Sequence, residues 1–190
     1  MLKEYEFILK FSLPDNEADP EIFIEKLGEA GCNDALIGIG RIGRIGLNFT
    51  RQSVSAIEAV LSAIKDVKRA IPDARLVEAA PDLVGLTDVA DLLGFTRQNM
   101  RKLMLRNPDF PPPLHEGKPS IWHLAKILRW MDNKKMYPIK APLLDIATIT
   151  MQFNITKDMQ DLEPAFQSNI KLCWPEKSAE IDFFSIFPTP

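Results

Sequence analysis

Hydrophobic and polar residues alternate at the beginning of the chain, and this alternation predicts a strand with one buried face. Apolar side chains occupy every second position from residue 5 to residue 13, and the positions between them are polar except for Ile8. Because successive side chains of a strand point to opposite faces, the apolar set would cover one face of a sheet. These residues are Tyr5, Phe7, Leu9, Phe11 and Leu13.

Two later stretches place apolar residues three or four positions apart, which is the spacing of one helix face. The first follows Asp19, a suitable N-cap before Pro20, and Gly31 can end it in the left-handed conformation. Ser53 or Ser55 can cap the second, and the spacing of Ser55 to Glu58 fits a capping box. The apolar positions are Ile22, Phe23, Leu27 and Ala30 in the first helix, and Ile57, Val60, Leu61, Ile64, Val67 and Ile71 in the second.

Three short apolar stretches, at residues 35–39, 45–49 and 75–78, are expected to form further strands. The resulting order, βαββαβ, is that of the split βαβ or ferredoxin-like arrangement, whose right-handed crossovers place both helices on one face of an antiparallel sheet. The predicted fold class is therefore α+β, with a ferredoxin-like unit at residues 1–83. We expect this unit to serve in dimerisation or sensing, although the fold alone identifies no function.

A glycine-rich stretch spells G-x-G-x-x-G with Gly38, Gly40 and Gly43. In a dinucleotide site such glycines open a helix directly after a strand, so that the pyrophosphate meets the helix N-terminus. Here another apolar strand follows, which favours a glycine-rich hairpin over a nucleotide site. Three nearby arginines are expected to be solvated, with a phosphate or ligand contact as the alternative: Arg41, Arg44 and Arg51.

Residues 86–133 place two short helical patterns around a glycine, followed by a proline-rich hairpin and a third helical pattern. Thr87 can cap the first helix, Gly94 supplies a left-handed turn, and Thr96 can cap the second helix. Phe95 is expected to point back into a small core. The inward side of the second helix is predicted to consist of Met100, Leu103 and Met104.

The outward face of this second helix holds amides and cations and no acid. Arg and Lys can donate to guanine, and Gln or Asn can pair with adenine, in the major groove of DNA. The positive N-terminal end of the helix also suits a phosphate. A basic helical module for protein interaction is the alternative. The candidate DNA-binding residues are Thr96, Arg97, Gln98, Asn99, Arg101, Lys102 and Arg106.

A two-stranded wing is expected between the second and third helices. Residues 110–114 are rich in proline, which lacks the N–H of a central strand and so favours an edge strand. Residues 115–118 would form the turn and residues 119–122 the returning strand. Lys118 near the tip is a further candidate DNA-binding residue, whereas Glu116 would repel phosphate. The inward side of the third helix is predicted to consist of Trp122, Leu124, Ile127, Leu128 and Met131, with Trp130 at its edge.

This arrangement resembles the AlpA/excisionase group of the MerR-like winged helix-turn-helix domains. The resemblance covers about 48 of the 190 residues and depends most on the Phe-Pro-Pro-Pro, wing and Ile-Trp-His portion. It implies that the second helix enters the major groove and that the wing lies on the flanking backbone. The chain departs from the family pattern at the Arg-Asn-Pro-Asp step before the wing, where a glycine-containing turn is common. The resemblance places Thr96, Arg97, Gln98, Asn99, Arg101 and Lys102 in the groove and Lys118 in the wing.

Charge is distributed unevenly along the chain. Residues 84–137, the expected winged helix-turn-helix domain, hold nine Lys/Arg and five Asp/Glu, a net charge of +4. The remaining residues hold 14 Lys/Arg and 21 Asp/Glu, a net charge of −7. Together the two parts give the overall net charge of −3. Such asymmetry indicates that one segment meets a polyanion, unless the clustering arose by chance.

Residues 138–190 are expected to form a C-terminal extension. Residues 143–151 could be a helix or a strand, because periodicity does not decide between them. A polar helical stretch is expected at about residues 157–166. The end of the chain, AEIDFFSIFPTP, is too apolar to remain exposed. We expect it to dock on the N-terminal unit or to contact a dimer mate or protein partner.

Composition excludes several classes of function. No apolar run is long enough to span a membrane, and two distant cysteines, Cys32 and Cys173, fit a reducing cytoplasm. His115 and His123 lack Cys or acid at ligand spacing, so we expect surface histidines and no metal or other cofactor. No catalytic constellation is recognisable, and an enzyme is not expected.

The sequence therefore predicts a cytoplasmic, sequence-specific binding protein for double-stranded DNA. We expect it to act as a homodimer, because one small module reads only a few base pairs. Its role would be the regulation of transcription or of a mobile element. The alternative is a protein-interaction component, such as an antitoxin or a defence-system partner, with an accessory DNA-binding module.

Overall fold

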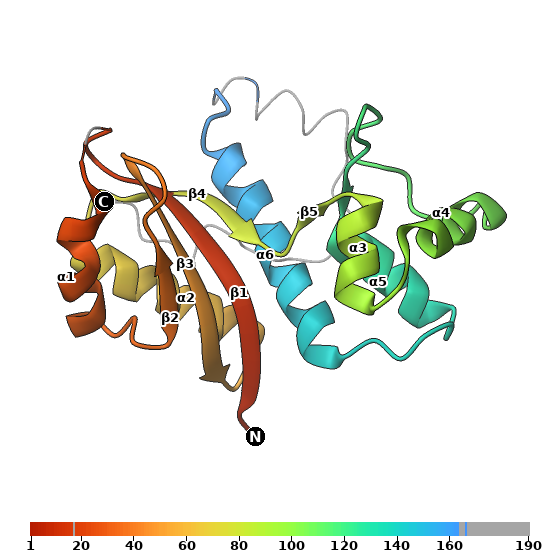
Figure 1. Ribbon diagram of the computed structural model, residues 1–190, viewed down its shortest axis with the longest axis horizontal. Coiled ribbons are helices and arrows are strands. Elements are labelled where there is room, and N and C mark those ends of the chain that lie inside the picture. Colours follow the sequence, from red (N-terminus) through yellow and green to blue (C-terminus); the bar gives the residue numbers. More distant parts are fainter. Residues whose placement is uncertain (17, 164–165, 167–190) are drawn as a thin grey trace. The chain divides into compact units, whose positions relative to one another are not determined.

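The computed structural model describes residues 1–16, 18–163 and 166. This part of the chain combines a four-stranded antiparallel sheet with six α-helices (Figure 1). Among these helices, none has the length and apolar character needed to cross a membrane. The contact predicted for the apolar C-terminal stretch, 179–190, lies outside the described residues.

The sheet orders its strands β2–β3–β1–β4, and each neighbouring pair is antiparallel. The long central strands are β1 (Lys3–Ser12) and β3 (Arg44–Ser53), and the edges are β2 (Ala35–Gly38) and β4 (Arg75–Ala80). The predicted alternation is confirmed, because four apolar side chains of β1 and Leu13 just after it are buried on one face, whereas Ile8 on the other face is 36% exposed. The glycine-rich stretch connects β2 to β3 as a hairpin, and the chain reverses through Gly43, whose φ of 71° requires glycine.

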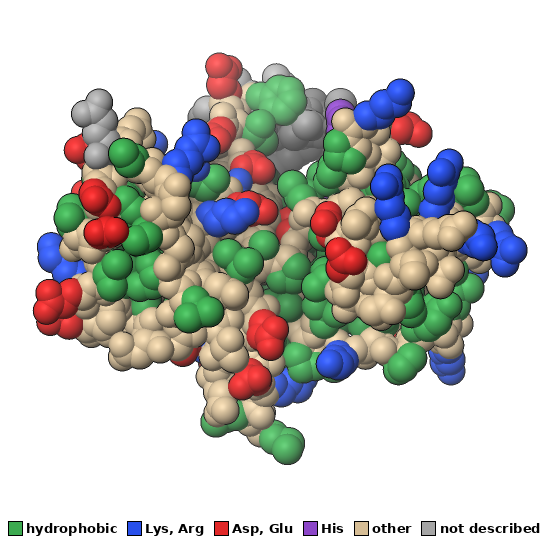
Figure 2. Space-filling view, in the orientation of Figure 1, with side chains coloured by type: hydrophobic (Ala, Val, Ile, Leu, Met, Phe, Trp, Pro, Cys, Tyr) green, Lys and Arg blue, Asp and Glu red, His purple; other side chains and the backbone are tan. Residues whose placement is uncertain are grey.

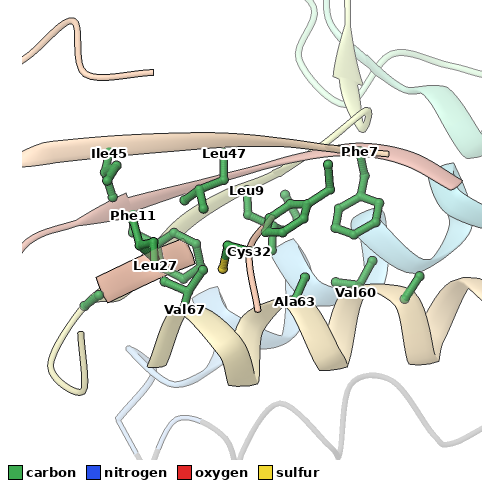
Figure 3. Packing of buried hydrophobic residues seen from close by; sticks show 14 of the residues in the cluster. Phe7, Leu9, Phe11, Leu27, Cys32, Ile45, Leu47, Val60, Ala63 and Val67 are labelled. Atoms are coloured by element: carbon green, nitrogen blue, oxygen red, sulfur yellow. The ribbon is translucent and has the colours of Figure 1, made fainter. Parts of the chain in front are cut away.

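Two helical segments cover one face of the sheet, and the first hydrophobic core lies between them and the strands. The first combines a 3-10 turn, η1 (Pro20–Phe23), with α1 (Ile24–Glu29), and the second is α2 (Ala56–Ala70). Figure 3 shows side chains of both central strands pointing at Val60, Ala63 and Val67 of α2. The fully buried large side chains of this core are Tyr5, Phe7, Leu9, Phe11, Leu27, Ile45, Leu47, Phe49 and Ile71.

The predicted helix starts are confirmed by their caps. Asp19 accepts a hydrogen bond from the Glu21 N–H at 3.0 Å, and Ser55 Oγ accepts one from the Glu58 N–H at 3.3 Å. Two predicted core positions are wrong, however, since Ile22 is 62% exposed and Ile57 is 40% exposed. In α2 the buried stripe runs instead through small residues, which let the helix approach the sheet closely: Ala56, Ala59, Val60, Ala63 and Val67.

Arg51 on β3 is buried, which corrects the prediction that it is solvated. Its Nε and Nη2 donate to both oxygens of Asp34 at 2.7 and 2.9 Å, and its Nη1 donates to Asp66 and Ser62 at 2.9 Å each. Nη2 also donates to the Gly31 carbonyl at 3.2 Å. Burial opposes the charge of Arg51, but the hydrogen bonds and charges of the two aspartates outweigh burial and raise the pKa of Arg51. The other two arginines near the hairpin are exposed, as predicted.

A second hydrophobic core is formed by the three helices that follow β4. These are α3 (Leu86–Leu93), α4 (Arg97–Arg106) and α5 (Leu124–Asn133), accompanied by a two-stranded ladder of β5 (Leu83–Val84) and β6 (Trp122–His123). The predicted inward sides of the second and third helices are confirmed, because their apolar residues belong to this core. Its buried members include Val89, Ala90, Met100, Phe110, Trp122, Leu124, Ile127, Leu128 and Met131.

One helix, α6 (Ala141–Met159), contributes side chains to both cores. Ile146 belongs to the first core, and the next residue, Ala147, belongs to the second together with Met151. The open question of helix or strand at residues 143–151 is thereby answered in favour of helix. The division of the chain into domains at 83/84 and 137/138 stays a prediction.

A buried polar network lies where the chain leaves β4 for α3, and it includes a histidine that the sequence assigned to the surface. His123 is 6% exposed, and its Nδ1 lies 2.7 Å from Asp82 Oδ1. Asn154 of α6 donates to Asp82 Oδ2 at 2.8 Å and forms two further 2.8 Å hydrogen bonds with the backbone of Ala79. The surface assignment of His123 is therefore wrong, because a buried imidazole needs a polar partner and Asp82 supplies it.

Candidate nucleic-acid interface

The first helix of the candidate interface begins earlier than the sequence indicated. Gly85, not Thr87, is the N-cap of α3, and Asp88 Oδ2 accepts a hydrogen bond from the Gly85 N–H at 2.7 Å. The helix start is therefore held by a carboxylate that reaches back from the third helical position to the N-cap N–H, and Thr87 does not act as the cap. Thr87 itself is an exposed residue of the first helical turn.

The turn between α3 and α4 has the geometry that the sequence predicts. Gly94 adopts the left-handed conformation with φ of 69° and ψ of 29°, and its N–H closes the last turn of α3. Thr96 caps α4 by accepting a hydrogen bond from the Asn99 N–H at 3.2 Å. Phe95, between them, packs against the second core. The tight turn and the two caps fix the orientation of α4 relative to α3.

Helix α4 rests on the second core by one side and presents the rest of its surface to solvent. Met100 is fully buried, and Leu103 and Met104 are partly buried against the same core. Leu105, on the opposite side, is 68% exposed, which makes it a rare large apolar residue on a polar surface. The candidate residues that the sequence singled out here are all exposed: Thr96, Arg97, Gln98, Asn99, Arg101, Lys102 and Arg106.

Among the described residues, the cations of α4 have no counter-charge. Within residues 1–16, 18–163 and 166, none of the four Lys/Arg side chains of α4 takes part in an ion pair or a side-chain hydrogen bond. Figure 2 shows Lys and Arg side chains gathered over this helix. The nearest following acid, Asp109, is bound instead by Lys134 at 2.7 Å and by Trp130 Nε1 at 3.1 Å. Hydrogen bonds from these two residues lower the pKa of Asp109.

The expected wing is reduced to a short loop, because its two strands pair at a single bridge, His115 to Ile121. Prolines remove the donors of the first strand, so the Ile121 carbonyl is shared by the N–H groups of Leu114 and His115 at 2.8 and 3.2 Å. The returning strand pairs elsewhere, since Trp122 forms a ladder with Val84 of β5. Lys118 is exposed at the loop tip, and so is Glu116.

A cleft on one flank of α4 involves a residue that the sequence did not single out. Tyr137, beyond the end of α5, packs against Phe95 with ring centroids 4.6 Å apart. The cleft between this tyrosine and α4 has a volume of about 440 Å3. Nothing in the local sequence pattern flags Tyr137, because its position depends on how the chain returns past α4. The lining residues are Phe95, Asn99, Met100, Lys102, Leu103, Arg106, Asn107 and Tyr137.

Comparison of the chain with protein-family models, with curated proteins and with solved structures gave no significant match. In the part of the chain that the structure describes, no group of three or more His, Cys, Asp or Glu side chains is arranged to hold a metal ion.

Proposed function

We propose that the protein binds double-stranded DNA in a sequence-specific manner and regulates transcription or a mobile element. The single observation that carries the proposal is the exposed surface of α4. It combines two amides with four cations that form no ion pair in the described part of the chain, and it holds no acid. A folded protein normally mixes charge signs on a solvated helix. An acid-free surface of uncompensated cations is what a polyanion neutralises, because binding releases the counterions of its phosphates.

The arrangement of α3, Gly94 and α4 supports a helix-turn-helix in which α4 is the recognition helix. On its solvent side, Gln98 can pair with adenine, Arg101 can donate to guanine, and Leu105 can contact a thymine methyl group. Thr96 and the free N–H groups of the first helical turn suit a phosphate. The loop that carries Lys118 would serve as a short wing on the flanking backbone.

The N-terminal sheet supports a ferredoxin-like unit, because its order of β4–β1–β3–β2 and its helices on one face match that arrangement. The face of this sheet that the described residues leave uncovered is the proposed homodimer contact. Leu36 and Ile8 flank Asn48 in one cross-strand row there, and they are 77% and 36% exposed. A pair of modules would read two half-sites and so reach useful specificity.

The proposal is tested by selection of binding sites from a pool of random-sequence DNA duplexes. The full chain is expected to enrich one sequence, and a gel shift at fixed salt would then show tighter binding to that duplex than to a scrambled one. The wild type is compared with the variant Gln98→Ala, which has the same net charge and lacks one proposed base contact. Absence of any enriched sequence for the wild-type chain would reject sequence-specific binding.

A further inference from the structure

The cleft between α4 and Tyr137 combines groups that neutralise charge with groups that donate hydrogen bonds. Asn99, Lys102, Leu103 and Arg106 follow the i, i+3, i+4, i+7 spacing, which places them on one side of α4. The two cations lie at the solvent edge of that side, since both are exposed, whereas Leu103 is partly buried beneath them. The helix therefore supplies one wall of the cleft with positive charge and an amide.

The opposite wall is held in place by packing and by backbone hydrogen bonds. Tyr137 is 42% exposed and lies against Phe95, the residue that precedes the cap of α4. The chain reaches Tyr137 through a turn in which the Lys135 N–H donates to Asp132 O at 2.9 Å and Lys135 has a φ of 51°. The phenol hydroxyl of Tyr137 can act as a hydrogen-bond donor at this wall.

The segment that carries Tyr137 adds to the positive charge of this flank. Residues 134–140 contain three lysines and no acid. Lys134 is bound to Asp109, but Lys135 and Lys140 are exposed and form no side-chain ion pair in the described residues. The α4 wall of the cleft therefore attracts an anion, and no acid is among the lining residues.

We infer that this cleft binds a phosphate group of the DNA backbone beside the major groove that α4 enters, an inference that rests on the proposed function. Lys102 and Arg106 neutralise the phosphate, and Asn99 and Tyr137 donate neutral hydrogen bonds to its oxygens. Gln98 and Leu105 lie away from the cleft on the solvent-facing side of α4, from which they can reach base edges. In this proposal the solvent-facing side of α4 contacts the bases, and the side that lines the cleft contacts the DNA backbone.

Lys102 and Arg106 are therefore expected to contribute to affinity for any DNA sequence, whereas Gln98 and Leu105 are expected to determine sequence preference. The test uses the full chain and measures the observed association constant against salt concentration, on a random-sequence duplex and on the duplex enriched by selection. Lys102→Gln and Arg106→Gln are each expected to reduce the slope of log K against log salt by about 1 on both duplexes. Tyr137→Phe is expected to weaken binding by about two- to tenfold without a change in slope, because it removes a neutral donor only.

Lys126→Gln is the matched control, since Lys126 is an exposed cation of α5 outside the cleft. It is expected to leave both the slope and the enriched sequence unchanged. Cleft variants that keep the wild-type slope would overturn the phosphate site while leaving the proposed function standing. A changed enriched sequence in Lys102→Gln or Arg106→Gln would also overturn it, because these residues would then read bases. A wild-type chain that binds neither duplex rejects the proposed function itself.

Discussion

Asp82 and His123 form a buried pair, with 2.7 Å between the aspartate Oδ1 and the histidine Nδ1. The second carboxylate oxygen of Asp82 accepts a hydrogen bond from Asn154, and its backbone carbonyl accepts one from the Leu124 N–H at 2.7 Å. Asp82 thereby joins the segment after β4 to the beginning of α5 and to α6. This polar centre therefore adds to the apolar contacts of α6 in joining the helices that include α4 to the sheet.

Loss of the Asn154 side chain is expected to destabilise the fold. Asn154→Ala removes three hydrogen bonds and leaves the Ala79 N–H and carbonyl and one Asp82 oxygen buried without a partner. The free energy of unfolding should fall by about 2–4 kcal/mol, because buried polar groups without partners are costly. Urea denaturation measures this difference. Gln152→Ala, on the exposed side of the same helix, serves as the control and should change stability by no more than about 0.5 kcal/mol. Equal effects of the two substitutions would contradict the role of the network.

Arg51→Ala is expected to be among the most destabilising single changes in the sheet. The substitution leaves the carboxylates of Asp34 and Asp66 close together in a partly buried site without their shared cation. We expect a loss of about 2–4 kcal/mol in the free energy of unfolding, reduced from the value for a fully buried pair because Asp34 remains partly exposed. Arg44→Ala, on the solvent face of the same strand, should have little effect in the same denaturation experiment. A loss no larger than that of Arg44→Ala would show that the network contributes little.

Much of the sheet and its helices could be predicted, because local patterns determine them. The alternation in β1, the caps Asp19 and Ser55, and the left-handed Gly94 depend only on neighbouring residues, and all were confirmed. The burial of Arg51 could also have been recognised. It continues the alternation of the apolar residues at 45, 47 and 49, which point to the helix-covered face.

Other features depend on contacts between distant segments, which periodicity does not encode. His123 is buried because Asp82, a residue in another part of the chain, supplies its partner. The wing was overestimated because Trp122 pairs with β5, a two-residue strand too short to be recognised from sequence. The flank of α4 became a cleft only because the chain returns with Tyr137 beside Phe95. The outward face of α4, in contrast, followed directly from helical spacing.

Cys32 is expected to favour the folded state at neutral pH and to lose that contribution in alkali. Burial, followed by the nearby charge of Asp66, raises the pKa of the Cys32 thiol from 9.0 to about 11. The Cys32 thiol therefore ionises at lower pH in the unfolded chain than in the folded chain. Its contribution to the free energy of unfolding is lost as pH rises from about 9 through about 11. Between pH about 8 and about 10, the wild type should lose more unfolding free energy than Cys32→Ala. Identical pH dependence of the two chains would contradict burial of the thiol.

Leu36→Asp is expected to disrupt the proposed homodimer. Leu36 is 77% exposed on the uncovered face of the sheet, so a charge there should not disturb the monomer fold but would be costly in an apolar contact. Sedimentation velocity should show a dimer for the wild type and a monomer for the variant. Thr50→Asp, elsewhere on the same face, tests whether any added charge has this effect. A dimer that persists in Leu36→Asp would place the contact elsewhere.

The most direct test of DNA binding by α4 is the affinity of the double variant Arg101→Ala, Lys102→Ala for the duplex that the wild type enriches. At fixed salt, a gel shift should show a loss of about 100-fold or more, because one base contact and one phosphate contact are removed together. Circular dichroism should show an unchanged fold, since both side chains are exposed and neither forms an ion pair with a residue that the structure describes. The variant Lys65→Ala, Lys126→Ala removes the same charge from α2 and α5 and should bind nearly as the wild type does. Equal affinity of wild type and the Arg101/Lys102 variant would contradict DNA recognition by α4.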